Sequence, residues 1–214
     1  MYNKIPIIIF GLNDLAELSL YYFNNDTRYS QHYEVIGFTV NKKYNTTGMY
    51  LNLPVWDWED LQHNDGLEDS YLFAPLISNN LRKQIYEEGL DKGFKFISYI
   101  SSKCTNFSKS IGKNCFILED NTIQPFVTIG DNVIIWSGSH IGHSTQIESN
   151  VYLTSQVVIS GHCHIKEGAF IGVNSCLRDG ITIGKNSVVG MGSVVLKSIP
   201  DEQTWIGNPA KLKL

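Results

Sequence analysis

The chain has 214 residues, which is enough for one large domain or two small ones. Its hydrophobic content of 43% and charged content of 18% are ordinary for a globular protein, and its net charge of −4 does not favour binding to nucleic acid or to an anionic membrane. No apolar run is long enough to span a membrane, no secretory signal is evident and the four cysteines form no C-x-x-C pair, so we expect a cytoplasmic protein with reduced thiols.

The first 100 residues alternate between short apolar runs and segments whose apolar residues have helical spacing. Strands are expected at Pro6–Phe10, Tyr33–Val40, Tyr71–Leu76 and Phe94–Ile100, and helices at Leu12–Phe23, Asp57–Leu61 and Ser78–Leu90. This alternation predicts a small parallel sheet of Rossmann type over residues 1–100.

The turn after the first predicted strand reads G-L-N-D-L-A, beginning at Gly11. It lacks the G-x-G-x-x-G spacing of a dinucleotide site, so we do not predict binding of NAD. The N-terminus of the helix that follows can still receive a phosphate through its free N–H groups. The alternative is a structural strand–helix–strand unit that binds nothing.

A repeat with a period of six begins at Ile111 and continues to Val195. Every sixth residue in this stretch is aliphatic, and the residue four positions later is mostly small or β-branched. A second period of eighteen places Asn or Gly at residues 114, 132, 150, 168 and 186, and both residue types tolerate left-handed turns. The pattern predicts a triangular coil of three short strands per eighteen residues, with aliphatic side chains inside. A long β-sandwich is the alternative, but it gives no reason to keep one register throughout.

The polar, Ser-rich segment at residues 101–110 lies before this register, so we place the junction between the two domains there. The predicted domains are residues 1–100 and 101–214. The repeat resembles that of the left-handed parallel β-helix acyltransferases. With the Rossmann-like domain and the G-N-P-A-K segment at residues 207–211, the whole chain resembles the bacterial nucleotide-sugar N-acetyltransferases, which are grouped with the sialic acid O-acetyltransferase family. This resemblance implies that the first domain holds the nucleotide-sugar and that the β-helix holds acetyl-CoA.

The resemblance also implies positions for the site residues. Contacts to the nucleotide-sugar are expected from Gly11, Asn13, Asp14 and Leu15, from Val40 and Asn41, and from Asn79, Asn80 and Arg82. Acetyl-CoA contacts are expected from Tyr152, Gly161, Val173 and Met191. The first turn has less Gly than is typical of the family and no His, and Val40 and Asn41 stand where the family often has acidic residues.

Among the outward-facing histidines, His143 matches the position of the family's general base. An imidazole suits this role because its unperturbed pKa lies near neutrality. The family usually follows this His with an acidic residue, whereas this chain has Ser144. Tyr152 stands where the family has a second His. The Gly161 amide, one coil after His143, is expected to bind the thioester oxygen, although the residue could equally be a turn glycine.

The resemblance implies a homotrimer with active sites between subunits, and three outward aromatic residues, Phe126, Trp136 and Phe170, would otherwise form exposed apolar surface. The predicted function is acetyl-CoA-dependent N-acetylation of a nucleotide-linked amino sugar for surface glycan synthesis, with no metal. O-acetylation of a sugar, a zinc hydratase of the γ-carbonic anhydrase kind and a non-catalytic trimeric scaffold remain alternatives. The zinc alternative is disfavoured because no two histidines are thirty-six residues apart.

Overall fold

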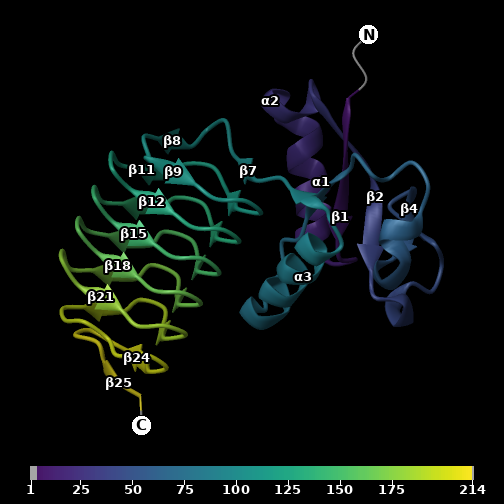
Figure 1. Cartoon of the computed structure of the whole chain (residues 1–214). Helices are drawn as coiled ribbons and strands as arrows, with labels where there is room; N and C mark the ends of the chain where they lie inside the picture. The colour runs from purple at the N-terminus through teal and green to yellow at the C-terminus, as the bar shows by residue number, and fades with distance from the viewer. Residues whose placement is uncertain (1–3, 214) are drawn as a thin grey trace. The chain divides into compact units, whose positions relative to one another are not determined.

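The computed structural model describes residues 4–213. The chain divides into two compact units, the first ending at Ser98 and the second beginning at Tyr99 (Figure 1). No helix within residues 4–213 has the length and apolar character that crossing a membrane requires. The two units are described separately below.

The first unit is a mostly parallel six-stranded sheet with the strand order β3-β4-β2-β1-β5-β6. Its strands are β1 (Ile5–Phe10), β2 (Tyr33–Val40), β3 (Met49–Tyr50), β4 (Leu53–Asp57), β5 (Tyr71–Phe73) and β6 (Lys95–Phe96). Its helices are α1 (Asp14–Asn25), α2 (Thr27–Ser30) and α3 (Asn79–Asp91), with 3₁₀ segments η1 (Lys42–Tyr44) and η2 (Trp58–His63). The β3–β4 hairpin is antiparallel and was not predicted.

The two faces of this sheet pack against different helices, because alternate residues of a strand point to opposite faces. Ile8 and Leu72 lie in one apolar cluster with Ile85 of α3 and Trp58 of η2. On the other face, Phe23 of α1 packs edge-on against Phe73, with ring centroids 5.2 Å apart. Helices therefore cover both faces, as the strand–helix alternation predicts.

The second unit is a parallel β-helix built from three sheets (Figure 1). One sheet contains β7 (Tyr99–Ile100), β10 (Phe116–Ile117), β13 (Ile134–Ile135), β16 (Tyr152–Leu153), β19 (Phe170–Ile171), β22 (Val188–Val189), β24 (Thr204–Ile206) and β25 (Lys211–Leu212). The second contains β8 (Thr105–Asn106), β11 (Thr122–Ile123), β14 (His140–Ile141), β17 (Val158–Ile159), β20 (Cys176–Leu177) and β23 (Val194–Val195). The third contains β9 (Ser110–Ile111), β12 (Thr128–Ile129), β15 (Gln146–Ile147), β18 (His164–Ile165) and β21 (Thr182–Ile183).

The predicted inward residues form the core of this β-helix. Ile123, Ile141 and Ile159, one coil apart from each other, are fully buried. Each buried aliphatic side chain contributes about 2 kcal/mol through removal of apolar surface from water. The small residues four positions later, such as Ser139 and Thr145, are buried as well, and their hydroxyls donate to backbone carbonyls. The predicted fold class, an α/β domain followed by a hexapeptide β-helix, is confirmed.

One corner of the β-helix carries a column of asparagines. Asn114, Asn132, Asn150 and Asn186 have φ between 53° and 64°, in the left-handed region that Asn tolerates. Asn114 Nδ2 donates to Asn132 Oδ1, and Asn132 Nδ2 donates to Asn150 Oδ1, each at 2.6 Å. Gly168 interrupts the column, and the side chain of Asn186 reaches into the space that a Cβ there would occupy. From Asn114 to Asn150, the predicted period of eighteen is therefore a hydrogen-bonded ladder along the stack.

The structure differs from the sequence prediction where the two units meet in the sequence. The expected strand Phe94–Ile100 is two strands: β6 completes the first sheet, and β7 pairs with β10 in the β-helix. The Ser-rich segment expected at the junction belongs to the first coil, because β8 pairs with β11 and β9 with β12. Thr105 and its partner Thr122 are 17 residues apart, whereas Thr122 and His140 are 18 apart. This one-residue shortening shifts the register before Ile111 and hides the first coil from a search for the repeat.

Candidate active site

His143 lies at a corner of the β-helix, in the turn between β14 and β15. Its side chain is exposed. Its backbone N–H donates to Gln124 Oε1 at 2.9 Å, so a side chain of the preceding coil holds the main chain in place. The ring therefore faces solvent from a rigid position, which the role of general base requires.

Glycine at residue 161 lets the imidazole of His143 approach the next coil. A Cβ added to Gly161 would lie 2.9 Å from Nε2 of His143, closer than real Cβ atoms come, and 3.1 Å from Cε1, so the imidazole would have to move aside. Among residues 4–213 the structure gives the Gly161 N–H no hydrogen-bond acceptor. A free amide beside an imidazole is the arrangement expected of an oxyanion donor next to a base.

Close packing between coils explains a second glycine at this corner. A Cβ on Gly142 would lie 2.5 Å from the backbone nitrogen of Gly161. Any side chain at Gly142 would therefore push the two coils apart and move His143 away from Gly161. Close backbone approach is the use of glycine here, and it needs no left-handed conformation.

His162 is a member of this cluster that the sequence did not identify as functional. Its ring packs edge-on against that of His143, with centroids 4.8 Å apart and an interplanar angle of 88°. The two residues are nineteen positions apart, one coil plus one residue. That spacing was a signal for contact, because residues one coil apart lie about 4.8 Å from each other along the stack.

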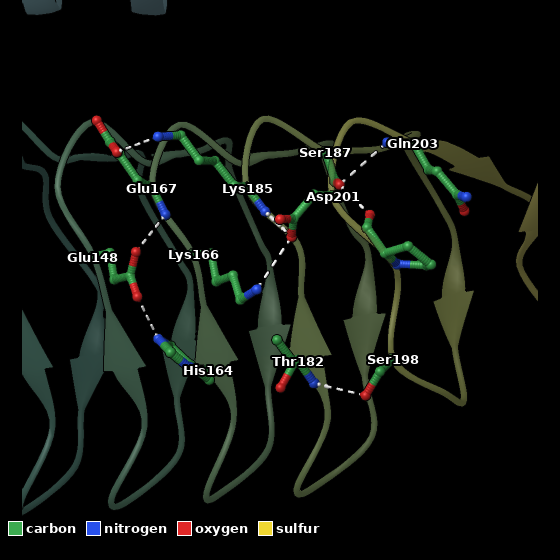
Figure 2. Close-up of polar contacts among 11 residues, drawn as sticks. Glu148, His164, Lys166, Glu167, Thr182, Lys185, Ser187, Ser198, Asp201 and Gln203 are labelled. Carbon is green, nitrogen blue, oxygen red and sulfur yellow. Dashed lines mark hydrogen bonds and ion pairs between the residues drawn. The ribbon is translucent and has the colours of Figure 1, made fainter.

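The other outward histidines lie elsewhere. His140 is in β14 itself and is partly buried. His164 lies in β18 on a different face, where its Nε2 is 2.6 Å from Glu148 Oε1 (Figure 2). Glu148 also accepts the backbone N–H of Glu167, and the Lys166 ammonium donates to Asp201 nearby (Figure 2). His164 is thus part of a surface network of hydrogen bonds and ion pairs, which gives it a structural role.

The remaining residues predicted to bind acetyl-CoA do not cluster with His143 within one chain. Tyr152 is buried in β16, where its hydroxyl accepts from Trp136 Nε1 at 2.6 Å and its ring stacks on Phe170. Val173 and Met191 follow β19 and β22 of the same sheet, at another corner, and are exposed. Their proposed contacts with acetyl-CoA stay predictions.

In the first unit, two of the predicted substrate loops come together. Gly11 follows β1, and a Cβ added there would lie 3.8 Å from Leu76 in the loop after β5. The strand order reverses between β1 and β5, and ligands of open α/β sheets bind at such a point beyond the carboxyl ends of the strands. Asn13 caps α1, and Ser78 caps α3. The predicted residues around Gly11 and Asn79 therefore border one region.

The charges of the two helix N-termini differ. The first turn of α1 contains Asp14 and Glu17. Burial raises the pKa of Tyr50, and the nearby carboxylates of Glu17 and Asp14 raise it further. The first turn of α3 contains no acidic residue. A phosphate is thus better accommodated at α3, beside Asn79 and Asn80, than at α1.

Arg82 is placed differently from the expectation. Its side chain is fully buried, and it donates from Nη1 to Leu76 O at 2.6 Å and from Nη2 to Asn79 Oδ1 at 2.9 Å. The guanidinium therefore shapes the loop from within and does not face a ligand directly. Its position in the first turn of α3 places Arg82 near the loop after β5, but the sequence of that turn does not show that its side chain is buried.

Three further predicted residues have structural surroundings. Leu15 and Val40 are buried in the core of the first unit. Asn41 donates from Nδ2 to Glu59 Oε1 at 3.3 Å, and the same carboxylate accepts the Lys42 N–H at 2.8 Å. Desolvation opposes ionisation of Glu59, but these hydrogen bonds outweigh it and lower its pKa.

No group of three or more His, Cys, Asp or Glu side chains within residues 4–213 is arranged to hold a metal ion. The predicted absence of a metal stays a prediction, which a metal analysis of the pure protein would test.

Comparison with known proteins gives the following matches. Residues 108–143 match the family described as bacterial transferase hexapeptide (six repeats), and residues 164–197 match the hexapeptide repeat of succinyl-transferase. The acyl-[acyl-carrier-protein]–UDP-N-acetylglucosamine O-acyltransferase of Pseudomonas aeruginosa is 34% identical over 86 residues, which is 40% of this chain and 33% of that protein. The chain thus spans about a third of the length of this curated relative.

Solved structures match over nearly the whole chain. The acetyltransferase domain of PglB from Neisseria gonorrhoeae has a TM-score of 0.84 at 24% identity, covering 98% of this chain and 100% of that one. PerB from Caulobacter crescentus, solved with CoA and GDP-perosamine, has a TM-score of 0.84 at 24% identity, covering 100% and 99%. WeeI from Acinetobacter baumannii has a TM-score of 0.84 at 20% identity, covering 97% and 99%. These proteins share the two-part architecture, and the predicted hexapeptide repeat is confirmed.

Proposed function

We propose that this hexapeptide-repeat protein is an acetyltransferase that moves the acetyl group of acetyl-CoA to the amine of a nucleotide-linked sugar. The observation that carries the proposal is the corner at which the exposed imidazole of His143 packs against Gly161, whose N–H has no acceptor among the described residues. The fold match to PerB, which was solved with CoA and GDP-perosamine, supports this class of substrates.

The chemistry of the reaction assigns a role to each group at this corner. The amine nitrogen attacks the thioester carbonyl carbon, and the imidazole of His143 accepts the proton that the amine loses. The carbonyl oxygen gains negative charge, which the Gly161 N–H would stabilise by a hydrogen bond worth about 3 kcal/mol. The carbon–sulfur bond then breaks, and the leaving thiolate takes the proton back from the imidazolium of His143, which restores the base. No metal takes part in this scheme.

The first unit would hold the nucleotide. The support comes from the loops after β1 and β5, which meet near Gly11 and Leu76. The acid-free first turn of α3 would receive a phosphate. The carboxylate of Asp14, in the first turn of α1, would accept a hydrogen bond from a sugar hydroxyl. The fragment of residues 1–100, if it folds, should bind the nucleotide that the full chain prefers.

The protein is proposed to act as a homotrimer with active sites between subunits. Within one chain, His143 lies at one corner and Val173 and Met191 lie at another, so a neighbouring subunit would bring the two groups of residues together. Phe126 is 70% exposed, as is expected of a residue that packs against a partner. Light scattering that gives the mass of a 24.1 kDa monomer at micromolar concentration would contradict the trimer.

The decisive experiment is thiol release from acetyl-CoA in the presence of a panel of UDP-, dTDP- and GDP-linked amino sugars. Mass spectrometry of the product should show one added acetyl group, and matched sugars with a hydroxyl in place of the amine should not react. Reaction of the hydroxyl sugars instead would establish O-acetylation. Absence of thiol release with every acceptor would contradict the enzyme and favour a scaffold.

A further inference from the structure

His162 lies in an unusual backbone conformation directly beside His143. Its φ is 57°, in the left-handed region that few residues other than Gly adopt, although Asn, Asp and His do so more often than the rest. Its backbone N–H donates to the carbonyl oxygen of His143 at 2.9 Å. The corresponding residue one coil earlier is the small Ser144, with φ of 59°, and one coil later it is Gly180, with φ of 68°. The corner therefore needs a left-handed residue, but it does not need an imidazole.

The ring of His162 supplies a contact that the rest of the corner does not. It meets the ring of His143 edge to face at 4.8 Å, in the geometry that aromatic pairs favour. The nearest polar partner of the His143 ring is Ser144 Oγ, 3.4 Å from Nδ1, which is long for a hydrogen bond. Within residues 4–213 no carboxylate forms an ion pair with His143, whereas His164 is held by Glu148 at 2.6 Å.

We infer that His162 is a positioning residue for His143, in place of the acidic residue that would otherwise orient a catalytic imidazole. Gln124 fixes the backbone of His143, Gly161 leaves room for its ring, and the His162 ring restricts rotation of the imidazole. An imidazole that keeps one orientation presents its nitrogen to the amine more often, and this raises kcat. The inference rests on the proposed role of His143 as general base.

The test uses two substitutions that separate the ring from the backbone. His162→Asn removes the aromatic ring and keeps a residue that tolerates the left-handed conformation. His162→Phe keeps an aromatic ring. Phe126 occupies the equivalent position two coils earlier with a φ of 68°, so phenylalanine is compatible with the left-handed conformation at this corner. His140→Ala, which removes another outward imidazole of the same coil as His143, is the control.

We expect His162→Asn to lower kcat roughly 3- to 10-fold, the worth of one aromatic pair, while KM for acetyl-CoA stays unchanged. His162→Phe should restore most of the rate, and His140→Ala should retain it. NMR spectra of the full chain labelled at histidine report the surroundings of the His143 ring. Its resonances should shift in His162→Asn, which loses the neighbouring ring. In His162→Phe they should still show the shift that a neighbouring aromatic ring causes.

Unchanged kcat and unchanged His143 resonances in His162→Asn would overturn the inference, and so would a phenylalanine variant as slow as the asparagine variant. A loss in His162→Asn as large as in His143→Ala would mean that His162 itself takes the proton. The NMR measurement needs no substrate. If the resonances respond as expected but no acetyl transfer is found, the ring contact stands and the proposed reaction fails.

Discussion

Gly161 and the imidazole of His143 lie against each other in neighbouring coils, and a Cβ at residue 161 would lie 2.9 Å from Nε2. A side chain at that position must therefore displace the ring. The φ of Gly161 does not require glycine, so the residue serves to admit the imidazole.

Gly161→Ala should lower kcat by roughly 10- to 100-fold, because the displaced ring no longer meets the amine in the right geometry. Alanine keeps the backbone N–H, so the loss reports the position of the ring and not the loss of an oxyanion donor. Steady-state kinetics with the best acceptor would measure it. Ser160→Ala, in the same turn, is the control. If Gly161→Ala were as active as the wild type, the contact would have no part in the reaction.

His143→Ala should lower kcat by roughly 10²- to 10⁴-fold, the usual contribution of a positioned general base. The melting temperature should change little, because the side chain is exposed and fills no core. KM for acetyl-CoA should also change little, since the base acts on the amine. His140→Ala, in β14 of the same coil, should keep most of the activity. Comparable rates in the two variants would exclude His143 as the base.

Arg82→Met should raise KM for the nucleotide-sugar and leave KM for acetyl-CoA unchanged. The buried guanidinium holds Leu76 O and the Asn79 side chain, so its loss would release the loop expected to bind the nucleotide. The free energy of unfolding should also fall, by about 3 kcal/mol, because these buried acceptors lose their donors. Arg82→Lys should restore part of the affinity for the nucleotide-sugar and part of the free energy of unfolding. A rise in both KM values together would instead indicate general loss of structure.

Asn132→Ala should lower the free energy of unfolding by about 2–4 kcal/mol. The change removes a fully buried side chain that accepts from Asn114 and donates to Asn150, and it places alanine at φ of 62°. Asn132→Gly removes the same hydrogen bonds without the backbone strain. The difference between the two variants, expected at about 1 kcal/mol from urea unfolding, isolates the cost of the left-handed conformation. Equal stability of the two variants would show that strain plays no part.

Asp201→Asn should make stability less sensitive to acid. The Lys185 N–H donates to this carboxylate at 2.9 Å and Lys166 Nζ at 3.2 Å, and these contacts lower its pKa (Figure 2). Because the folded pKa lies below the unfolded one, the carboxylate stabilises the fold above its ordinary pKa, and this contribution is lost as pH falls through the folded value. Melting temperatures measured between pH 6 and about 3 should therefore decline less in Asp201→Asn than in wild type. A parallel decline would contradict the coupling.

The sequence predicted the β-helix well because every coil has the same packing and backbone requirements at the same positions. Inward residues such as Ile141 must be apolar in every coil, and left-handed corners favour residues such as Asn132, so both periods are visible in one chain. The first coil was missed because its register is one residue short. The β3–β4 hairpin was missed because such short strands carry too few residues for a pattern.

At the candidate site, the sequence predicted His143 and the glycine one coil after it, Gly161, but not the His162 ring beside them. The spacing of nineteen residues signals that His143 and His162 lie in neighbouring coils, but the edge-to-face contact of their rings depends on side-chain orientation, which spacing does not give. The burial of Arg82 and of Tyr152 could not be predicted either, because a motif gives spacing and says nothing of which atoms cover a side chain.

The fixed length of each coil limits where this chain can gain or lose residues. His143 and Gly161 meet because eighteen residues separate them, so a single insertion between them would have to bulge out of a corner or turn the imidazole away from its neighbour. The first coil, at residues 99–115, is one residue shorter than the next coil and still pairs with it. Changes of length are therefore tolerated at the open ends of the stack or in steps of a whole coil, while the coils that carry the two histidines keep their length.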